Sequence, residues 1–176
     1  WLSTQSGGVA RFDGSGWITY NEYLSPSHPI IFAKSILCHP DGSVWVGAAA
    51  GTAGGLYRFF NNTWTLYPSA VTSLGGWIES LVVDTSGVVY AGSANGGMTR
   101  FDGVTWTHYS PQNSGLLNER IHDLAVDSQN NIWASSFNCG GPGGLSKFDG
   151  TGFTTHLMYT NIEKIFIDSA DNIWFN

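Results

Sequence analysis

Three residues with acid or base side chains occupy the same position in a pattern that recurs along this 176-residue chain. Glu79, His122 and Glu163 each stand two residues before the first residue of a short apolar run. Residues at one position of a repeat can converge in space, and an imidazole beside a carboxylate is suited to general acid–base catalysis. One hypothesis is therefore an enzyme in which His122 serves as the base.

Aspartates recur at two other positions of the pattern, and both are turn positions. Paired carboxylates can act as acid and base, but Asp is also favoured in turns because its side chain accepts hydrogen bonds from nearby backbone N–H groups. A residue that recurs in each repeat fits the structural role better. We therefore interpret the following residues as turn-capping: Asp84, Asp127 and Asp168 at one position, and Asp13, Asp102 and Asp149 at the other.

Four of the seven basic residues also recur at one position, directly before a phenylalanine. A ring of cations around an anionic ligand is one interpretation. We favour another, in which each side chain covers apolar surface with its stem and pairs with a turn aspartate. The four residues are Arg11, Arg58, Arg100 and Lys147.

Several kinds of site and partner are excluded. The five histidines lack the short spacing typical of metal ligands, and no phosphate-binding loop or nucleophile elbow occurs, so we expect neither a metal nor a cofactor. A net charge of −6 argues against nucleic acid as a partner, and no apolar run is long enough to insert into a membrane. Cys38 and Cys139 define no disulfide framework, and Cys38 occupies an apolar position where we expect a buried thiol.

The pattern itself is an internal repeat marked by aromatic residues 41 to 45 residues apart, namely Trp1, Trp45, Tyr90, Trp133 and Trp174. Each unit contains an apolar run, a turn, the marker aromatic, a pair of glycines, a strand that ends in Phe, and a final aromatic strand. We expect two-residue turns between the last two strands, at pairs such as Asn61-Asn62 and Asp102-Gly103. Each unit therefore predicts four short antiparallel strands.

Identical four-stranded units can bury both faces only by stacking on their neighbours. When the stacked units are arranged radially, they form a β-propeller. Consecutive β-sandwich domains are the alternative, but a sandwich needs seven or more non-repeating strands. We predict an all-β propeller with partial blades at 1–20 and 161–176 and blades at 32–67, 77–109 and 120–156. Seventeen strands exceed the sixteen of a closed four-bladed ring, so we expect an excerpt of a larger propeller with further blades outside this chain, a closed ring with an overhang being the alternative.

The repeat resembles the two-component regulator propeller repeat, most clearly in "LAVDSQNNIWAS" at 124–135 and "GGMTRFDGVTWTHY" at 96–109. The sequence departs from the pattern at His39, where other units have Asp, and at Phe60-Asn61-Asn62. The resemblance implies the extracytoplasmic sensor region of a regulator, where carbohydrate sensing is common, or a secreted protein. It also leaves open a propeller lyase or hydrolase, since streptogramin lyase is related in architecture, or a structural repeat of a surface assembly.

Binding residues are expected on the connections that vary between repeats, since variable loops on a rigid scaffold commonly carry function. Turns within the first and the last strand pair of each unit are short, so the longer connections emerge together on the opposite face. We expect a non-catalytic site for a small glycan or a peptide there, outside the cytoplasm. The candidate ligand-binding residues are Trp77, Glu119, Arg120, His122, Phe137, Asn138, Tyr159 and Glu163.

Overall fold

The computed structural model describes residues 1–4, 8–20, 32–49, 55–75, 77–137 and 141–176. Within these ranges the chain forms seventeen strands and two four-residue helices. The first sheet contains β1 (Leu2–Thr4), β2 (Gly8–Phe12) and β3 (Trp17–Tyr20). The second contains β4 (Ala33–Cys38), β5 (Val44–Ala48), β6 (Gly55–Phe60) and β7 (Thr63–Pro68), and α1 (Ser69–Thr72) follows it.

The remaining strands continue the same arrangement. The third sheet contains β8 (Ile78–Val83), β9 (Val89–Ser93), β10 (Met98–Phe101) and β11 (Trp106–Tyr109), followed by α2 (Pro111–Ser114). The fourth contains β12 (Ile121–Val126), β13 (Ile132–Ser136), β14 (Gly144–Phe148) and β15 (Phe153–Met158), and the fifth β16 (Ile165–Ile167) and β17 (Ile173–Phe175).

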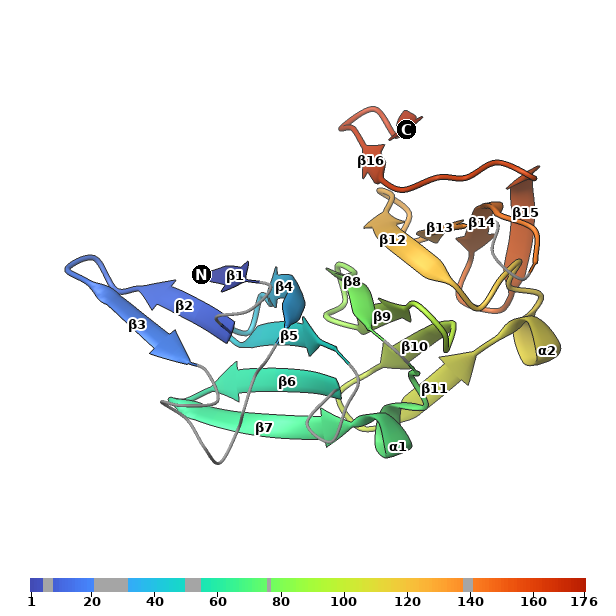
Figure 1. Ribbon diagram of the computed structural model, residues 1–176. Helices are drawn as coiled ribbons and strands as arrows, with labels where there is room; N and C mark the ends of the chain where they lie inside the picture. Colours follow the sequence, from blue (N-terminus) through green and yellow to red (C-terminus); the bar gives the residue numbers. More distant parts are fainter. Residues whose placement is uncertain (5–7, 21–31, 50–54, 76, 138–140) are drawn as a thin grey trace.

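Every sheet is antiparallel, and its strands lie side by side in chain order. The sheets fan around an arc, with the inner strands β4, β8, β12 and β16 next to one another along its concave side (Figure 1). The outer strands β7, β11 and β15 lie on the convex side. The predicted all-β propeller of four-stranded blades is confirmed.

The core lies between successive sheets rather than within any one of them. The cluster between the first two sheets joins Val9 of β2 to Val46 and Phe59 of the second sheet. Each later cluster likewise contains residues of two neighbouring sheets, such as Tyr90 of the third with Phe148 of the fourth. A single blade therefore buries its faces only against its neighbours.

The marker aromatics form the contacts between blades. Each marker in the first three sheets packs its ring against the Phe that ends the third strand of the next blade, at centroid distances that aromatic pairs favour. These pairs are Trp1 with Phe59 at 5.1 Å, Trp45 with Phe101 at 5.7 Å, and Tyr90 with Phe148 at 6.3 Å. The repeat spacing seen in the sequence is thus the spacing of inter-blade contacts.

The turn aspartates cap their turns, as interpreted from the sequence. Asp127 Oδ1 accepts hydrogen bonds from the backbone N–H groups of Gln129 (3.0 Å) and Asn131 (2.8 Å). Its Oδ2 accepts one from Nε1 of Trp133 at 3.0 Å, so the carboxylate ties the turn to the marker aromatic. Asp168 makes the equivalent bonds.

The predicted two-residue turns between the third and fourth strands are wrong for three of the four blades. Asn61-Asn62 forms such a turn, with both residues at positive φ. The other three turns have four residues, as the pairing of Phe148 with Phe153 shows. There the aspartate side chain accepts bonds from the backbone two and three residues on, at 2.9 and 3.1 Å for Asp149, and this capping stabilises the longer loop.

The recurring cations follow the favoured interpretation. Arg58 Nη2 lies 2.7 Å from Asp41 Oδ2, and Arg100 Nη1 lies 3.1 Å from Asp102 Oδ2. Three of the four cations, Arg11, Arg58 and Lys147, also lie over the marker aromatic of the adjacent strand, and Lys147 Nζ is 5.5 Å from the centroid of the Trp133 ring. These residues therefore belong to the scaffold.

Cys38 is exposed, so the expectation of a buried thiol is wrong. Cys38 lies two residues after Ile36 and hence on the same side of β4, which faces the first sheet. That sheet has only three strands and ends at β1 on its inner side. The equivalent Val126 on β12 packs in a cluster beside a complete blade, and Cys38 has no such cover.

Asp123 joins three inner strands, and sequence analysis did not single it out. Its side chain is only 13% exposed. Oδ1 accepts a hydrogen bond from Ser80 Oγ on β8 at 2.8 Å, and Oδ2 accepts one from the backbone N–H of Ile165 on β16 at 3.1 Å. A buried carboxylate with several partners is a strong positional constraint, so Asp123 fixes the concave edge of the arc.

Two glycines at positive φ, Gly97 and Gly103, provide a matched test of the fold. Gly97 has φ +68°, and an added Cβ would lie 2.2 Å from the carbonyl oxygen of Tyr109. Gly103 has φ +96° with no atom within 4 Å of that position. Gly103→Ala is expected to cost about 1 kcal/mol for its backbone conformation alone. Gly97→Ala adds a backbone collision and is expected to cost about 3 kcal/mol or more in urea denaturation; equal losses would contradict this packing.

Turn capping also predicts how stability depends on pH. Hydrogen bonds hold the pKa values of Asp13, Asp149 and Asp168 at about 2, below the usual 3.8; the largest contributions come from Ser15, Thr151 and Trp174, respectively. Because these pKa values are lower in the folded state, their contribution is complete above about pH 4 and is lost as the pH falls towards 2. Asp149→Asn keeps an acceptor but removes one titrating group, so its urea midpoint is expected to fall less steeply below pH 4. Identical acid profiles would contradict the assignment.

Candidate functional site

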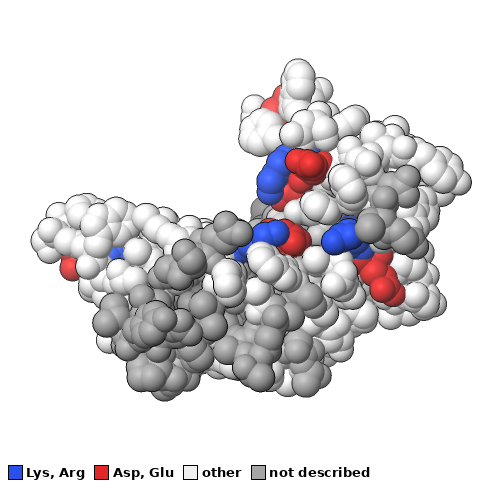
Figure 2. All heavy atoms as spheres, in the orientation of Figure 1, with Lys and Arg blue, Asp and Glu red and all other residues white. Residues whose placement is uncertain are grey.

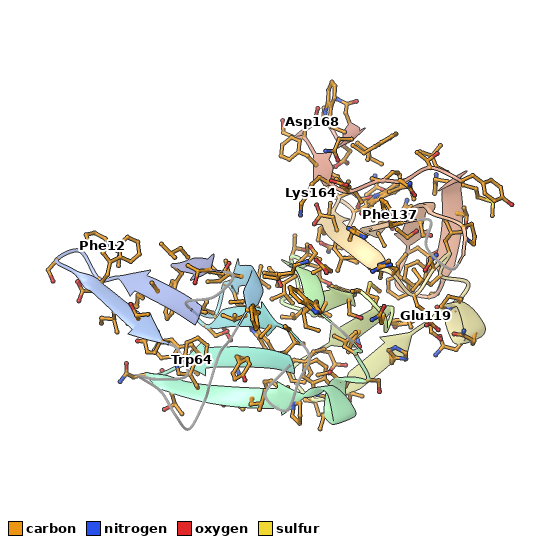
Figure 3. All side chains as sticks on the ribbon, viewed as in Figure 1. Phe12, Trp64, Glu119, Phe137, Lys164 and Asp168 are labelled. Carbon is orange, nitrogen blue, oxygen red and sulfur yellow. The ribbon has the colours of Figure 1, made fainter. Side chains whose placement is uncertain are left out.

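The connections after the second and fourth strands form a pocket between the third and fourth blades. Its volume is about 490 Å³, within the range of small-molecule sites. We call it the loop-face pocket, and its polar lining comes from Asn95, Gln112, Asn118, Glu119 and Arg120. Glu119 lies beside α2 (Figure 3).

The backbone of the loop-face pocket is held in place by hydrogen bonds. Asn118 Nδ2 donates to the carbonyls of Phe137 (3.4 Å) and Pro142 (3.2 Å), and Asn118 Oδ1 accepts from the N–H of Arg120 (2.9 Å). The Glu119 carbonyl accepts from the N–H of Gly97 at 2.8 Å. In the described part of the chain, neither Glu119 nor Arg120 forms a salt bridge, so a rigid scaffold presents an unpaired carboxylate and an unpaired guanidinium.

A second group of polar residues lies on the inner strands. The pairing of β4, β8 and β12 with their neighbours shifts register at one position, around Lys34, Glu79 and His122. A β-bulge of this kind re-aims the side chain that it carries. Acidic and basic side chains accordingly gather on the concave side of the molecule (Figure 2). We call Lys34, Glu79, His122 and Glu163 the inner cluster.

Within the inner cluster, Lys34 forms a salt bridge with the carboxylate of Glu79. Its Nζ lies 2.6 and 2.9 Å from the two carboxylate oxygens of Glu79, whose side chain is only 15% exposed. The same Nζ lies 4.8 Å from the centroid of the Trp77 ring. Glu79 and Trp77 are thus both held by a cation from the preceding blade.

His122 belongs to the inner cluster and is also close to Arg120 of the loop-face pocket. Burial lowers its pKa, and nearby Arg120 and Lys34 lower it further, whereas Glu79 and Glu163 act in the opposite direction. Its ring packs against Phe137 with 5.3 Å between centroids. The imidazole is therefore neutral near pH 7 and is held on an aromatic face.

The structure brings most of the predicted site residues together, but not all. Glu119 and Arg120 line the loop-face pocket, and Arg120 and Glu163 are close enough to His122 to act on its pKa. Tyr159 lies apart, at the end of β15, with 78% of its surface exposed. Asn138 lies outside the described residues.

Two kinds of site residue were not predicted from the sequence. Lys34 could have been found, because it stands two residues before Ile36, at the position of Glu79 and His122 in the other repeats. Asn95, Gln112 and Asn118 carried no repeat signal, since they lie in connections that differ between blades. Among the described residues, no three His, Cys, Asp or Glu side chains are grouped as metal ligands, and no helix is long and apolar enough to cross a membrane.

Comparison with solved structures identifies the fold. The chain is similar to the extracellular domain of BT3049 from B. thetaiotaomicron, a protein assigned to the hybrid two component systems, with 20% identity and a TM-score of 0.73 over 99% of the chain and 23% of the relative. The extracellular domain of BT4673 from the same organism is 17% identical, with a TM-score of 0.74 over 97% and 26%. PorZ, a surface component of the type-IX secretion system of Porphyromonas gingivalis, is 14% identical, with a TM-score of 0.73 over 98% and 29%.

The chain thus spans about a quarter of the length of these proteins, and at such identities the likeness concerns the fold. No curated protein matches the sequence. Residues 115–138 match the family model described as the two component regulator propeller. This range contains the marker Trp133 and the capping Asp127, which carried the resemblance in the sequence. The chain thus has the fold of a β-propeller, and one of its repeats, at residues 115–138, matches the two component regulator propeller model.

Proposed function

We propose that this propeller is a non-catalytic binding module of an extracytoplasmic sensor, and that it binds a small glycan in the loop-face pocket. The observation that carries the proposal is that neither Glu119 nor Arg120 forms a salt bridge with another described residue, while the backbone that carries them is hydrogen-bonded. A preorganised site binds at a lower entropic cost than a mobile one.

The polar lining suits a sugar. A carboxylate accepts hydrogen bonds from hydroxyl groups, a guanidinium donates several in a fixed geometry, and amides such as Asn95 and Gln112 can do both. Sugar hydroxyls need donors and acceptors together, and a ligand of one charge sign would find only one of these two ionic groups favourable.

The inner cluster supports binding over catalysis. Both oxygens of Glu79 accept hydrogen bonds from Lys34, so Glu79 is not free to take a proton from a substrate. His122 then retains Glu163 as its remaining acidic neighbour from the predicted set. The acid–base hypothesis therefore loses one of the three groups on which it was based.

The similar solved structures support the cellular setting. Two of them are extracellular domains of bacterial regulatory proteins. Trp17 and Trp174, at opposite ends of the arc, are 59% and 61% exposed, although the equivalent Trp106 and Trp45 pack between blades. The proposal therefore also includes further propeller blades that pack against these two exposed faces.

A glycan array followed by calorimetry with the best sugar tests the proposal. Arg120→Ala and Glu119→Gln are each expected to weaken binding about tenfold or more, because a hydrogen bond to a charged group contributes about 1.5–3 kcal/mol. Glu163→Gln, which lies outside the pocket lining, is the matched control and is expected to leave affinity within about twofold.

The triple variant Glu79→Gln, His122→Gln, Glu163→Gln would abolish turnover in an enzyme but should leave pocket binding nearly intact.

The proposal has two clear failures. If no sugar on the array binds at millimolar concentration, the glycan assignment is wrong. If a sugar binds equally well to the wild type, Arg120→Ala and Glu119→Gln, the ligand lies elsewhere on the molecule.

A further inference from the structure

One hydrogen bond recurs in the third, fourth and fifth blades and is missing from the second. In each of the three blades, Oδ2 of the turn aspartate accepts a hydrogen bond from the side-chain O–H or N–H of the marker aromatic. These bonds are Tyr90 Oη to Asp84 at 3.2 Å, Trp133 Nε1 to Asp127 at 3.0 Å, and Trp174 Nε1 to Asp168 at 3.0 Å. The aromatic donor is satisfied by a carboxylate each time.

The second blade has His39 at the aspartate position, and its imidazole is engaged elsewhere. His39 Nε2 lies 2.9 Å from the carbonyl oxygen of Gly87 in the next blade, and Nδ1 lies 2.7 Å from Asp41 Oδ1. The marker of this blade, Trp45, is only 2% exposed, yet its Nε1 has no hydrogen-bond partner within the described residues. Arg58 Nε is also buried, and no described residue is its hydrogen-bond partner.

Both unpartnered donors belong to side chains that line one small cavity between the second and third blades. Its lining also includes His39, Asp41 and Gly87, and its volume is about 60 Å³. One water needs about 10–15 Å³ of such space and two to four polar partners. The cavity therefore has both the room and the polar groups to hold water.

We propose that this cavity holds an ordered water molecule that accepts hydrogen bonds from Trp45 Nε1 and Arg58 Nε. The water thereby takes the place of the carboxylate oxygen in the other blades. A buried N–H without a partner has lost its hydrogen bond to bulk water and gained none in return, so a water in the cavity is favoured over an empty cavity.

The local charges favour water over a small anion. Arg58 is already paired with Asp41, with 2.7 Å between Nη2 and Oδ2, so the cavity lining carries one positive and one negative group. The Asp41 carboxylate repels an anion but can accept a hydrogen bond from water. A water can thus accept from the two N–H groups and donate one bond to Asp41 and one to the Gly87 carbonyl, which satisfies all four of its bonds.

Magnetisation transfer from water to the indole N–H groups, measured by NMR on the 176-residue chain, tests the proposal. The Trp45 indole proton is expected to show a cross-peak of the sign given by a long-lived bound water. Trp133 is the internal control, because its Nε1 is bonded to Asp127 and it should show no such peak. His39→Asp supplies a carboxylate at the position used in the other blades, so the Trp45 cross-peak is expected to disappear in that variant.

Two results would overturn the proposal. Absence of the Trp45 cross-peak in the folded wild-type chain would show that no long-lived water is bound there. A saturable shift of the Trp45 indole resonance on titration with sodium bromide, absent with sodium fluoride at equal ionic strength, would show an anion site instead. Neither result depends on the His39→Asp variant folding.

Discussion

Stacking of one sheet on the next is the constraint from which the rest of this structure follows. Each blade has two apolar faces and too few strands to cover either, so the marker aromatics must pack against the following blade. The recurring aspartates, cations and glycines then serve this stacking. They set the turns, fix the aromatic rings and let the backbone approach closely where the strands meet.

The candidate site is a consequence of the same stacking. Successive blades bring corresponding residues of their inner strands together, so Lys34 reaches Glu79 and Ser80 reaches Asp123 across an interface. Connections after the second and fourth strands meet between the third and fourth blades and line a pocket there. The scaffold repeats and the connections do not, so the polar residues that line this pocket have no equivalents fixed by the repeat.

Sequence analysis predicted the fold because the repeat is visible in the residues that stack. The spacing of marker aromatics such as Trp45 and Trp133 predicted the blades. The shared repeat position of Glu79, His122 and Glu163 predicted that these side chains lie near one another. Other features depend on contacts that no single repeat contains. Cys38 is exposed because the neighbouring first sheet has only three strands. Asn118 holds the pocket together because its side chain bonds the connection that contains Phe137 and Pro142. The four-residue turns arise from capping by Asp149 and its equivalents, and a two-residue pattern alone does not show this.

The most direct test of the stacking account compares one residue type at one repeat position in two settings. Trp45 is 2% exposed between the second and third blades, whereas Trp174 is 61% exposed on the last blade. Trp45→Ala is predicted to lower the free energy of unfolding by about 3–5 kcal/mol, and Trp174→Ala by about 1 kcal/mol or less, both measured by urea denaturation. Similar losses for the two variants would show that the marker stabilises its own sheet, and would contradict the account.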